Sequence, residues 1–320
     1  MTNRGEPLLR VEDLRIRFDG SDVVSGASFE LGPGEVLGLV GESGCGKSLT
    51  ALAILQLVPP PGSVAGGKVI FSGVDLLALP EREMRRRRGA EIAMVFQEPG
   101  ASLNPVLSVG SQVAEVFTVH RGFSRRAAMR EAVALLERVG IPDAAARAGD
   151  APHRLSGGQR QRAAIAMAIA GRPRLLLADE PTTALDVTVQ AQILELLRRL
   201  REETGMAVVL ITHNLGVVAE MADRVAVMYA GKVVENAAVR DLFRRPLHPY
   251  TQGLFASLPD LRDPDKALLP IPGVVPRPDA MPSGCRFRDR CPLAGEICAE
   301  EPLLLARGPG HAVACHKVES

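Results

Sequence analysis

Short apolar runs alternate with amphipathic stretches along the middle of the chain. Residues 35–41, 174–179 and 206–213 are strand-sized apolar runs, which are typical of strands buried on both faces of a sheet. Residues 187–205 lie between the last two runs. They place apolar residues among charged ones at helical spacing and stop at Gly205. The order strand, crossover helix, strand predicts an α/β protein with a parallel sheet.

Other stretches predict different elements. Residues 8–35 alternate apolar and polar positions and break at Gly and Pro, which indicates several short antiparallel strands. Residues 117–140 have a helical period, and residues 224–236 predict two strands around an Ala-Gly turn. Proline becomes dense after about Asn236. We therefore expect a large domain at 1–240, with a helical subdomain at about 98–170, and a small C-terminal extension at 241–320.

Composition narrows the class of protein. The 320 residues are 46% hydrophobic and 23% charged, an ordinary globular balance, and the formal net charge of +1 supplies no basic field for nucleic acid. The basic run at 81–88 has no interleaved aromatic residue and predicts a solvated helix face. No apolar run reaches membrane-spanning length, and the N-terminus has no signal-peptide core. These features predict a soluble cytoplasmic chain.

The stretch GESGCGKS fits the pattern G-x-x-x-x-G-K-[ST] and lies between a predicted strand and a predicted helix. Its glycines let successive backbone N–H groups face phosphate oxygens, and the helix N-terminus adds a positive dipole. We expect Lys47 to bridge the β- and γ-phosphates and Ser48 to bind Mg²⁺, with Cys45 as a small filler. The expected nucleotide-binding residues here are Gly41, Glu42, Ser43, Gly44, Cys45, Gly46, Lys47, Ser48 and Leu49.

Two further motifs fit the same chemistry. A hydrophobic strand ends in Asp179 and Glu180; the first carboxylate can hold Mg²⁺ and the second can act as general base on water. The stretch LSGGQ opens an Ala-rich helical pattern, with Ser156 as a suitable N-cap and two glycines that allow close backbone approach. Its expected nucleotide-binding residues are Ser156, Gly157, Gly158 and Gln159.

In this order and spacing, the motifs resemble the ATP-binding subunits of ABC transporters from about Leu8 to Glu235. The resemblance implies a P-loop NTPase cassette with a RecA-like parallel-sheet core, an antiparallel β subdomain and a helical subdomain. Gly41–Ser48 resembles the Walker A motif, Leu175–Asp179 the Walker B motif, and LSGGQ the signature motif of that family.

The resemblance also implies a role for single residues. Glu180 matches the catalytic carboxylate, and His213 in LITHN matches the histidine that contacts the γ-phosphate. Gln97 in MVFQEP matches the glutamine that senses Mg²⁺ and the membrane partner, and Asp186 lies in the segment TALD of the D-loop. Phe18 stands where the family stacks an aromatic ring on adenine, although Tyr is commoner there.

The family mechanism implies that ATP joins two cassettes. One chain supplies the Walker A loop and Glu180, while the partner subunit's Ser156 and Gly158 cap the γ-phosphate. Hydrolysis then lets the two cassettes separate. Mg²⁺ would be held by Ser48, Gln97 and Asp179.

Stretches in the middle and tail, such as PLHPYTQGLFASLP and IPGVVPRPDAMPSGCRFRDRC, resemble the oligopeptide and dipeptide permease subfamily of importers. This implies an ATPase and translocase on the cytoplasmic side of the cell membrane. Its partners would be a second, different ATPase subunit, two transmembrane permeases and an extracytoplasmic binding protein, with no nucleic acid. Nickel, glutathione and opine importers share the pattern, so they remain alternatives. The alternative hypothesis from another functional class is a soluble ABC ATPase that acts on ribosomes or DNA.

Four of the five cysteines crowd into the tail with the spacing C-x₅-C-x₆-C-x₁₆-C. Disulfides do not suit a cytoplasmic chain. The spacing leaves a structural zinc site, in which His311 and His316 could compete as ligands, near even with an iron–sulfur cluster, and four unrelated cysteines are a third possibility. The importer resemblance implies a structural [4Fe–4S] cluster. The expected ligands are Cys285, Cys291, Cys298 and Cys315.

Overall fold

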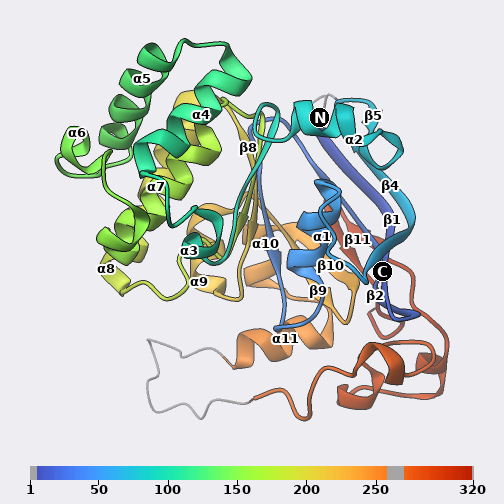
Figure 1. Cartoon of the computed structure of the whole chain (residues 1–320). Coiled ribbons are helices and arrows are strands. Elements are labelled where there is room, and N and C mark those ends of the chain that lie inside the picture. The colour runs from blue at the N-terminus through green and yellow to red at the C-terminus, as the bar shows by residue number, and fades with distance from the viewer. Residues whose placement is uncertain (1–5, 258–269, 319–320) are drawn as a thin grey trace. The chain divides into compact units, whose positions relative to one another are not determined.

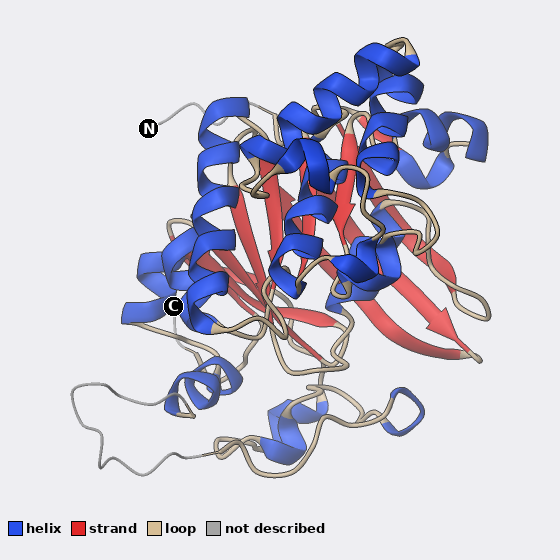
Figure 2. Ribbon diagram, turned by 60° about the vertical axis from the view of Figure 1, so that its left-hand side comes forward, coloured by secondary structure: helices blue, strands red, loops and turns tan. Residues whose placement is uncertain are grey.

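The computed structural model describes residues 6–257 and 270–318 of the chain (Figures 1 and 2). These residues form two compact units, each assembled from separate stretches of sequence. The first unit contains residues 6–8, 31–36 and 78–212, and the second contains residues 9–30, 37–77, 213–257 and 270–318. Among these described residues, no helix combines the length and the apolar character that crossing a membrane requires.

The first unit is built on three parallel strands in the order β8-β7-β6. Their bounds are β6 Ile92–Val95, β7 Leu175–Asp179 and β8 Ala207–Ile211. Every residue of β7 and β8 is buried, as their apolar runs predict, and the burial includes Asp179 at the end of β7. Helix α8 (Val187–Thr204) connects them, begins at its N-cap Asp186, and ends at Gly205, whose φ of 68° is left-handed. The predicted strand–helix–strand unit is therefore confirmed.

Helices α4, α5 and α7 pack against one another in the first unit (Figure 1). Besides α8, the unit's helices are α2 Glu81–Arg87, α3 Pro99–Ser102, α4 Val109–Arg121, α5 Arg125–Arg138, α6 Ala144–Arg147 and α7 Gly157–Ile169, with a 3-10 turn η2 at Pro152–Arg154. The helical pattern at 117–140 is two helices rather than one. The chain turns at Gly122, with φ 68°, and Ser124 caps α5 by accepting a hydrogen bond from the Ala127 N–H. In α2, Met84 is buried while Arg85 and Arg86 are exposed, so the basic run is a solvated face.

The second unit contains a four-stranded sheet in the order β2-β1-β4-β5. The bounds are β1 Leu9–Phe18, β2 Ser21–Leu31, β4 Ser63–Phe71 and β5 Val74–Asp75. Residues 8–35 thus contain two long strands, where the pattern predicted several short strands. The ladder between β1 and β4 is irregular near Asp13, whose φ is 46°. Such a bulge breaks the strict alternation from which strand length is judged.

The remaining strands of the second unit follow the order β11-β12-β10-β9-β3. Their bounds are β3 Val36–Val40, β9 Arg224–Tyr229, β10 Lys232–Ala238, β11 Leu305–Gly308 and β12 His311–Val313. The predicted turn between β9 and β10 is present, with positive φ at Ala230 and Gly231. The tail returns to this sheet, because β12 pairs with β10 and sets Val313 opposite Glu235. The described segment before β11, residues 270–304, consists of loop and short 3-10 turns.

The helices of the second unit are α1 Lys47–Ile54, α9 Leu215–Met221, α10 Val239–Arg244 and α11 Pro249–Ala256, and its 3-10 turns are η1 Leu76–Ala78, η3 Pro278–Ala280, η4 Arg288–Arg290 and η5 Glu296–Ala299. The proline-dense segment that begins after Asn236 therefore starts inside β10. The division of the chain at residue 240 stays a prediction. Part of the quoted importer-like sequence, at 258–259, lies outside the described residues.

Candidate nucleotide site

The glycine-rich loop joins β3 to α1 in the second unit. Strand β3 is buried throughout, and α1 begins at Lys47. Gly41, Gly44 and Gly46 have φ of 151°, 80° and 100°, values that side-chain-bearing residues rarely adopt. A Cβ at Gly41 would lie 2.1 Å from the carbonyl oxygen of Met228. The spacing of the glycines is therefore required by the backbone path, which turns the loop into a concave run of N–H groups suited to phosphate.

Lys47 is held inside this loop. It is 7% exposed, and its Nζ donates to the carbonyl oxygens of Gly41, at 2.8 Å, and Glu42, at 2.9 Å. Cys45 Sγ accepts at 3.6 Å. Burial raises the pKa of the Cys45 thiol, although Lys47 opposes the shift. The thiol is thus protonated and buried, in keeping with a filler. That the ammonium meets the β- and γ-phosphates stays a prediction.

At the acidic end of β7, in the first unit, residues from separate sequence motifs are in contact. Asp179 is 4% exposed. Glu180 follows with φ 44°, a strained conformation for a residue other than glycine and one that is common at functional sites. Its Oε2 accepts hydrogen bonds from Thr183 Oγ1 at 2.6 Å and from Gln97 Nε2 at 3.4 Å. A carboxylate oriented in this way is a suitable general base.

Thr183 is a site residue that the sequence reasoning missed. Its hydroxyl donates the shorter of the two hydrogen bonds to Glu180. The one sequence feature that could have indicated Thr183 is its position three residues after a candidate catalytic carboxylate. That signal is weak, because threonine is common in loops.

The LSGGQ stretch opens α7 as predicted. The Ser156 side chain accepts from the Gln159 N–H at 3.3 Å, and the Gln159 side chain accepts from the Ser156 N–H at 3.0 Å, which completes a capping box. A Cβ at Gly158 would lie 2.7 Å from Val189 Cγ1. Val189 also donates its N–H to Asp186 Oδ1 at 2.9 Å. The start of α7 and the Asp186 segment therefore pack as one feature of the first unit.

Phe18 and His213 belong to the second unit. Phe18 ends β1, and its ring occupies the space where a side chain at Gly62 would begin. His213 is exposed and directly precedes Asn214, which caps α9. The expected site residues are thus distributed over both units: Gly41–Ser48, Leu49, Phe18 and His213 in the second, and Gln97, Ser156, Gly157, Gly158, Gln159, Asp179, Glu180 and Asp186 in the first. Their individual roles, including those in Mg²⁺ binding, stay predictions.

The four cysteines of the tail lie within electrostatic range of one another in the second unit. Burial raises the pKa of Cys285 and of Cys291, and the nearby Cys298 and Cys315 thiols raise both further. The Cys285 N–H donates to the Cys298 carbonyl oxygen at 3.0 Å. Four partly buried thiols are a chemically suitable donor set for a metal. Within residues 6–257 and 270–318, however, no three or more His, Cys, Asp or Glu side chains are close enough together to hold an ion.

The histidines near these cysteines are engaged elsewhere. His311 Nε2 lies 2.7 Å from Glu235 Oε1, and His316 Nε2 lies 3.2 Å from the Glu300 carbonyl oxygen. The structure therefore gives no support to a zinc site that uses these two imidazoles.

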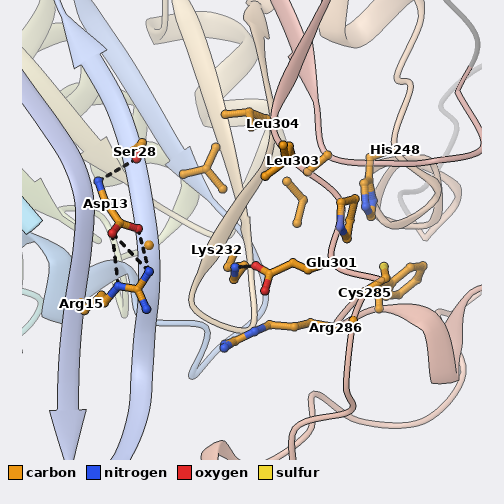
Figure 3. A pocket seen from close by; sticks show the side chains of 17 residues that line it. Asp13, Arg15, Ser28, Lys232, His248, Cys285, Arg286, Glu301, Leu303 and Leu304 are labelled. Carbon is orange, nitrogen blue, oxygen red and sulfur yellow. Dashed lines mark hydrogen bonds and ion pairs between the residues drawn. The ribbon is translucent and has the colours of Figure 1, made fainter. Parts of the chain in front are cut away.

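A pocket of about 450 Å³ lies within the second unit, between β1, β2, β10 and the tail (Figure 3). None of the loop residues Gly41–Ser48 lines it. Arg15 bonds to both carboxylate oxygens of Asp13, and Lys232 pairs with Glu301 (Figure 3). Arg286 donates to the Ala230 carbonyl oxygen. Since no residue of the phosphate-binding loop lines this pocket, it is separate from the candidate nucleotide site.

The glycine-rich loop lies between a buried strand and a helix and has a lysine at its end. A second buried strand ends in two acids. Together these features define a P-loop nucleoside triphosphatase. Residues 24–183, half of the 320-residue chain, match the ABC transporter family. Residues 234–298 match the oligopeptide/dipeptide transporter C-terminal region. The chain belongs to the ABC transporter family of ATP-binding proteins, and its reaction is ATP hydrolysis.

Curated relatives extend over nearly the whole chain. A protein of Brucella abortus (strain 2308) named as a peptide import ATP-binding protein is 52% identical over 313 residues, 97% of this chain and 94% of the relative. A protein of Sinorhizobium fredii named as a peptide ABC transporter ATP-binding protein is 52% identical over 319 residues, 98% of this chain and 95% of the relative.

Solved structures share the fold. The ATP-binding cassette MJ0796, in a dimeric post-hydrolysis state bound to ADP and Pi, aligns with a TM-score of 0.65 at 28% identity and covers 72% of this chain and 99% of that one. The protein cbiO1 of Clostridium perfringens, part of an ABC transporter complex, aligns with a TM-score of 0.64 at 27% identity and covers 75% and 92%. The predicted family and α/β cassette fold are confirmed.

Proposed function

We propose that this chain is the ATP-hydrolysing subunit of an importer that takes di- and oligopeptides across the cytoplasmic membrane. The observation that carries the proposal is the C-terminal region. Residues 234–298 match the region that characterises oligopeptide and dipeptide transporters, and the relatives at 52% identity are named for peptide import. A nucleotide-binding core by itself would fit many ABC proteins.

The test is reconstitution of the full chain in vesicles with its cognate permeases and binding protein. The proposal requires ATP-dependent accumulation of a labelled dipeptide or oligopeptide. Accumulation of nickel, glutathione or an opine, with no peptide uptake, would replace the cargo. ATPase activity that responds to ribosomes or DNA and never to the permeases would replace the transport function.

Two cassettes form the working unit in this proposal. The phosphate loop and Glu180 of one chain act together with the partner subunit's Ser156 and Gly158, which requires an ATP-bound dimer. The dimeric state of the related cassette MJ0796 supports this arrangement. The partner is a second, different ATPase, and the pair docks on two permeases at the cytoplasmic face of the membrane. Purification of the assembled complex and its subunit stoichiometry tests the composition; two copies of this chain would refute the heterodimer.

The residue roles that the family resemblance implies are part of this proposal. Lys47 would contact the β- and γ-phosphates, and Ser48, Asp179 and Gln97 would hold Mg²⁺. Glu180 acts as general base on water, and its hydrogen bonds from Thr183 and Gln97 fix its orientation. Bound Mg²⁺ would neutralise charge that develops on the phosphate oxygens.

We propose further that the four tail cysteines, Cys285, Cys291, Cys298 and Cys315, hold a structural [4Fe–4S] cluster. Support comes from the gathering of the four cysteines in one tail segment and from the burial that raises the pKa of the Cys285 and Cys291 thiols, because a bound metal would stabilise the thiolate form. Anaerobic purification followed by iron, sulfide and zinc analysis tests the identity of the metal. Four iron atoms per chain and a brown colour are expected. A colourless protein with stoichiometric zinc would assign zinc, and a metal-free, active protein would leave four structural thiols.

A further inference from the structure

Glu42 in the phosphate-binding loop is bound at three points. Its carbonyl oxygen accepts a hydrogen bond from Lys47 Nζ at 2.9 Å. Its N–H donates to Tyr250 Oη at 2.8 Å. Its carboxylate accepts from Arg290 through both oxygens, at 2.7 and 3.0 Å. Only the first of these contacts comes from the loop itself. The other two come from residues 208 and 248 positions later in the chain.

Arg290 is built into the tail as a fixed support. Its side chain is 6% exposed and that of Glu42 is 30% exposed. Its Nε donates to the Pro272 carbonyl oxygen at 2.8 Å, and its guanidinium lies 5.7 Å from the ring centroid of Tyr229 and 5.9 Å from that of Phe287. The bond to Glu42 raises the pKa of Arg290. A bidentate pair in this setting fixes both the position and the orientation of the carboxylate.

Tyr250 provides the second support, through α11. It is completely buried, and its ring lies 4.6 Å from Tyr229 and 5.4 Å from Phe287, centroid to centroid. The chain contains only two tyrosines, and both are in this cluster. Burial raises the pKa of Tyr250, so its hydroxyl is neutral and accepts the Glu42 N–H. Aromatic packing restricts the hydroxyl to one place.

From these contacts we propose that Arg290 and Tyr250 are positioning residues for nucleotide binding, through which the C-terminal region controls the shape of the phosphate-binding loop. They act through Glu42, whose carbonyl oxygen in turn holds the Lys47 ammonium. Neither residue lies within 24–183, the part of the chain that matches the ABC transporter family. Both lie within 234–298, the C-terminal region.

The coupling is reciprocal. If the tail holds the loop in its binding conformation, then a nucleotide that binds the loop must stabilise the contacts of Arg290 and Tyr250 by the same free energy. A tail that served only to complete the fold would not respond to nucleotide. The inference rests on ATP binding by the family and holds whatever the cargo.

The first experiment measures ADP affinity of the purified full chain by calorimetry, because ADP engages the phosphate loop without hydrolysis. Arg290→Ala and Glu42→Gln are each expected to weaken ADP binding about tenfold, within the usual range of coupling between sites. The double variant should bind no more weakly than either single variant, since both remove the same interaction. Arg290→Lys, which keeps the charge but lacks the two-pronged donor, should lie between them and the wild type.

Arg288→Ala is the matched control. Arg288 lies in the same turn, η4, and its hydrogen bonds are to Asp289 and Ser283, not to the loop. Its ADP affinity should equal that of the wild type. If Arg290→Ala fails to fold, Glu42→Gln still tests the same bond from the loop side, where the side chain is partly exposed.

Amide hydrogen exchange supplies the readout that a purely structural role would not change. ADP should slow exchange in residues 249–256 and 285–291 of the wild-type chain, and Glu42→Gln should abolish this effect. Wild-type ADP affinity in both single variants would overturn the proposal. So would exchange in these segments that is insensitive to ADP in the wild type.

Discussion

We expect His248 to make the C-terminal region less stable in acid. The side chain is 1% exposed and caps α11, because its Nδ1 accepts a hydrogen bond from the Tyr250 N–H at 3.0 Å. The backbone N–H of His248 donates to the buried carboxylate of Glu235 at 2.9 Å. Burial lowers the pKa of His248 from 6.5 to about 4, opposed by a hydrogen bond with the Ala314 backbone. A proton on Nδ1 would also remove the cap.

The sign and size of the effect follow from this shift. The folded state binds the proton less readily than the unfolded state, so the stabilisation is fully present above pH 6.5 and is lost as the pH falls toward 4. With 1.36 kcal/mol per pKa unit, a shift of about 2.5 units corresponds to at most about 3.4 kcal/mol. Between pH 7 and pH 5 the same linkage gives a loss of about 2 kcal/mol.

The assay is urea unfolding of the full chain at pH 7 and at pH 5, with His248→Asn as the variant. Asparagine can keep the N-cap acceptor but does not titrate. The wild type should lose about 2 kcal/mol more unfolding free energy than the variant between the two pH values. His153→Asn, at an exposed histidine, is the control and should behave as the wild type. Equal losses in wild type and His248→Asn would refute the assignment of the acid sensitivity to His248.

Three further outcomes are expected. Lys47→Ala should weaken ATP binding at least tenfold, because the phosphate charge loses its cation; unchanged affinity by calorimetry would contradict this. Glu180→Gln should leave ATP binding intact and lower hydrolysis in the assembled transporter about 100-fold; near-normal turnover would exclude Glu180 as the base. Deletion of residues 236–320 should lower the thermal midpoint by at least about 5 °C, because it uncovers Tyr229, which is completely buried; scanning calorimetry that shows an unchanged midpoint would be inconsistent with the tail's packing role.

Local patterns of apolar and polar residues predicted much of the fold. The apolar run at Leu175–Asp179 and the amphipathic run that ends at Gly205 have one structural solution each, so strand, helix and stop were predicted correctly. The prediction was less accurate where a single residue changed the local geometry. Gly122 divides one helical period into α4 and α5, and the bulge at Asp13 hides the length of β1.

The nucleotide site was likewise predictable from the sequence only where it depends on local residues. The sequence by itself determined the phosphate loop, the acid pair at Asp179–Glu180 and the capped start of α7, because each depends on neighbours a few residues away and on backbone conformations that only certain residues adopt. The importer-like segments also predicted the match of residues 234–298 to the oligopeptide/dipeptide transporter C-terminal region.

Only the tertiary structure determined the contacts between the C-terminal tail and the phosphate-binding loop. Nothing in the local pattern around Glu42 or Arg290 indicates that the two charges pair across 248 positions of sequence. That pairing depends on β12 returning to β10 and on Tyr229, Tyr250 and Phe287 closing into one cluster. Side-chain periodicity reports which face of an element is buried, whereas the partner on that face is chosen when the whole chain packs.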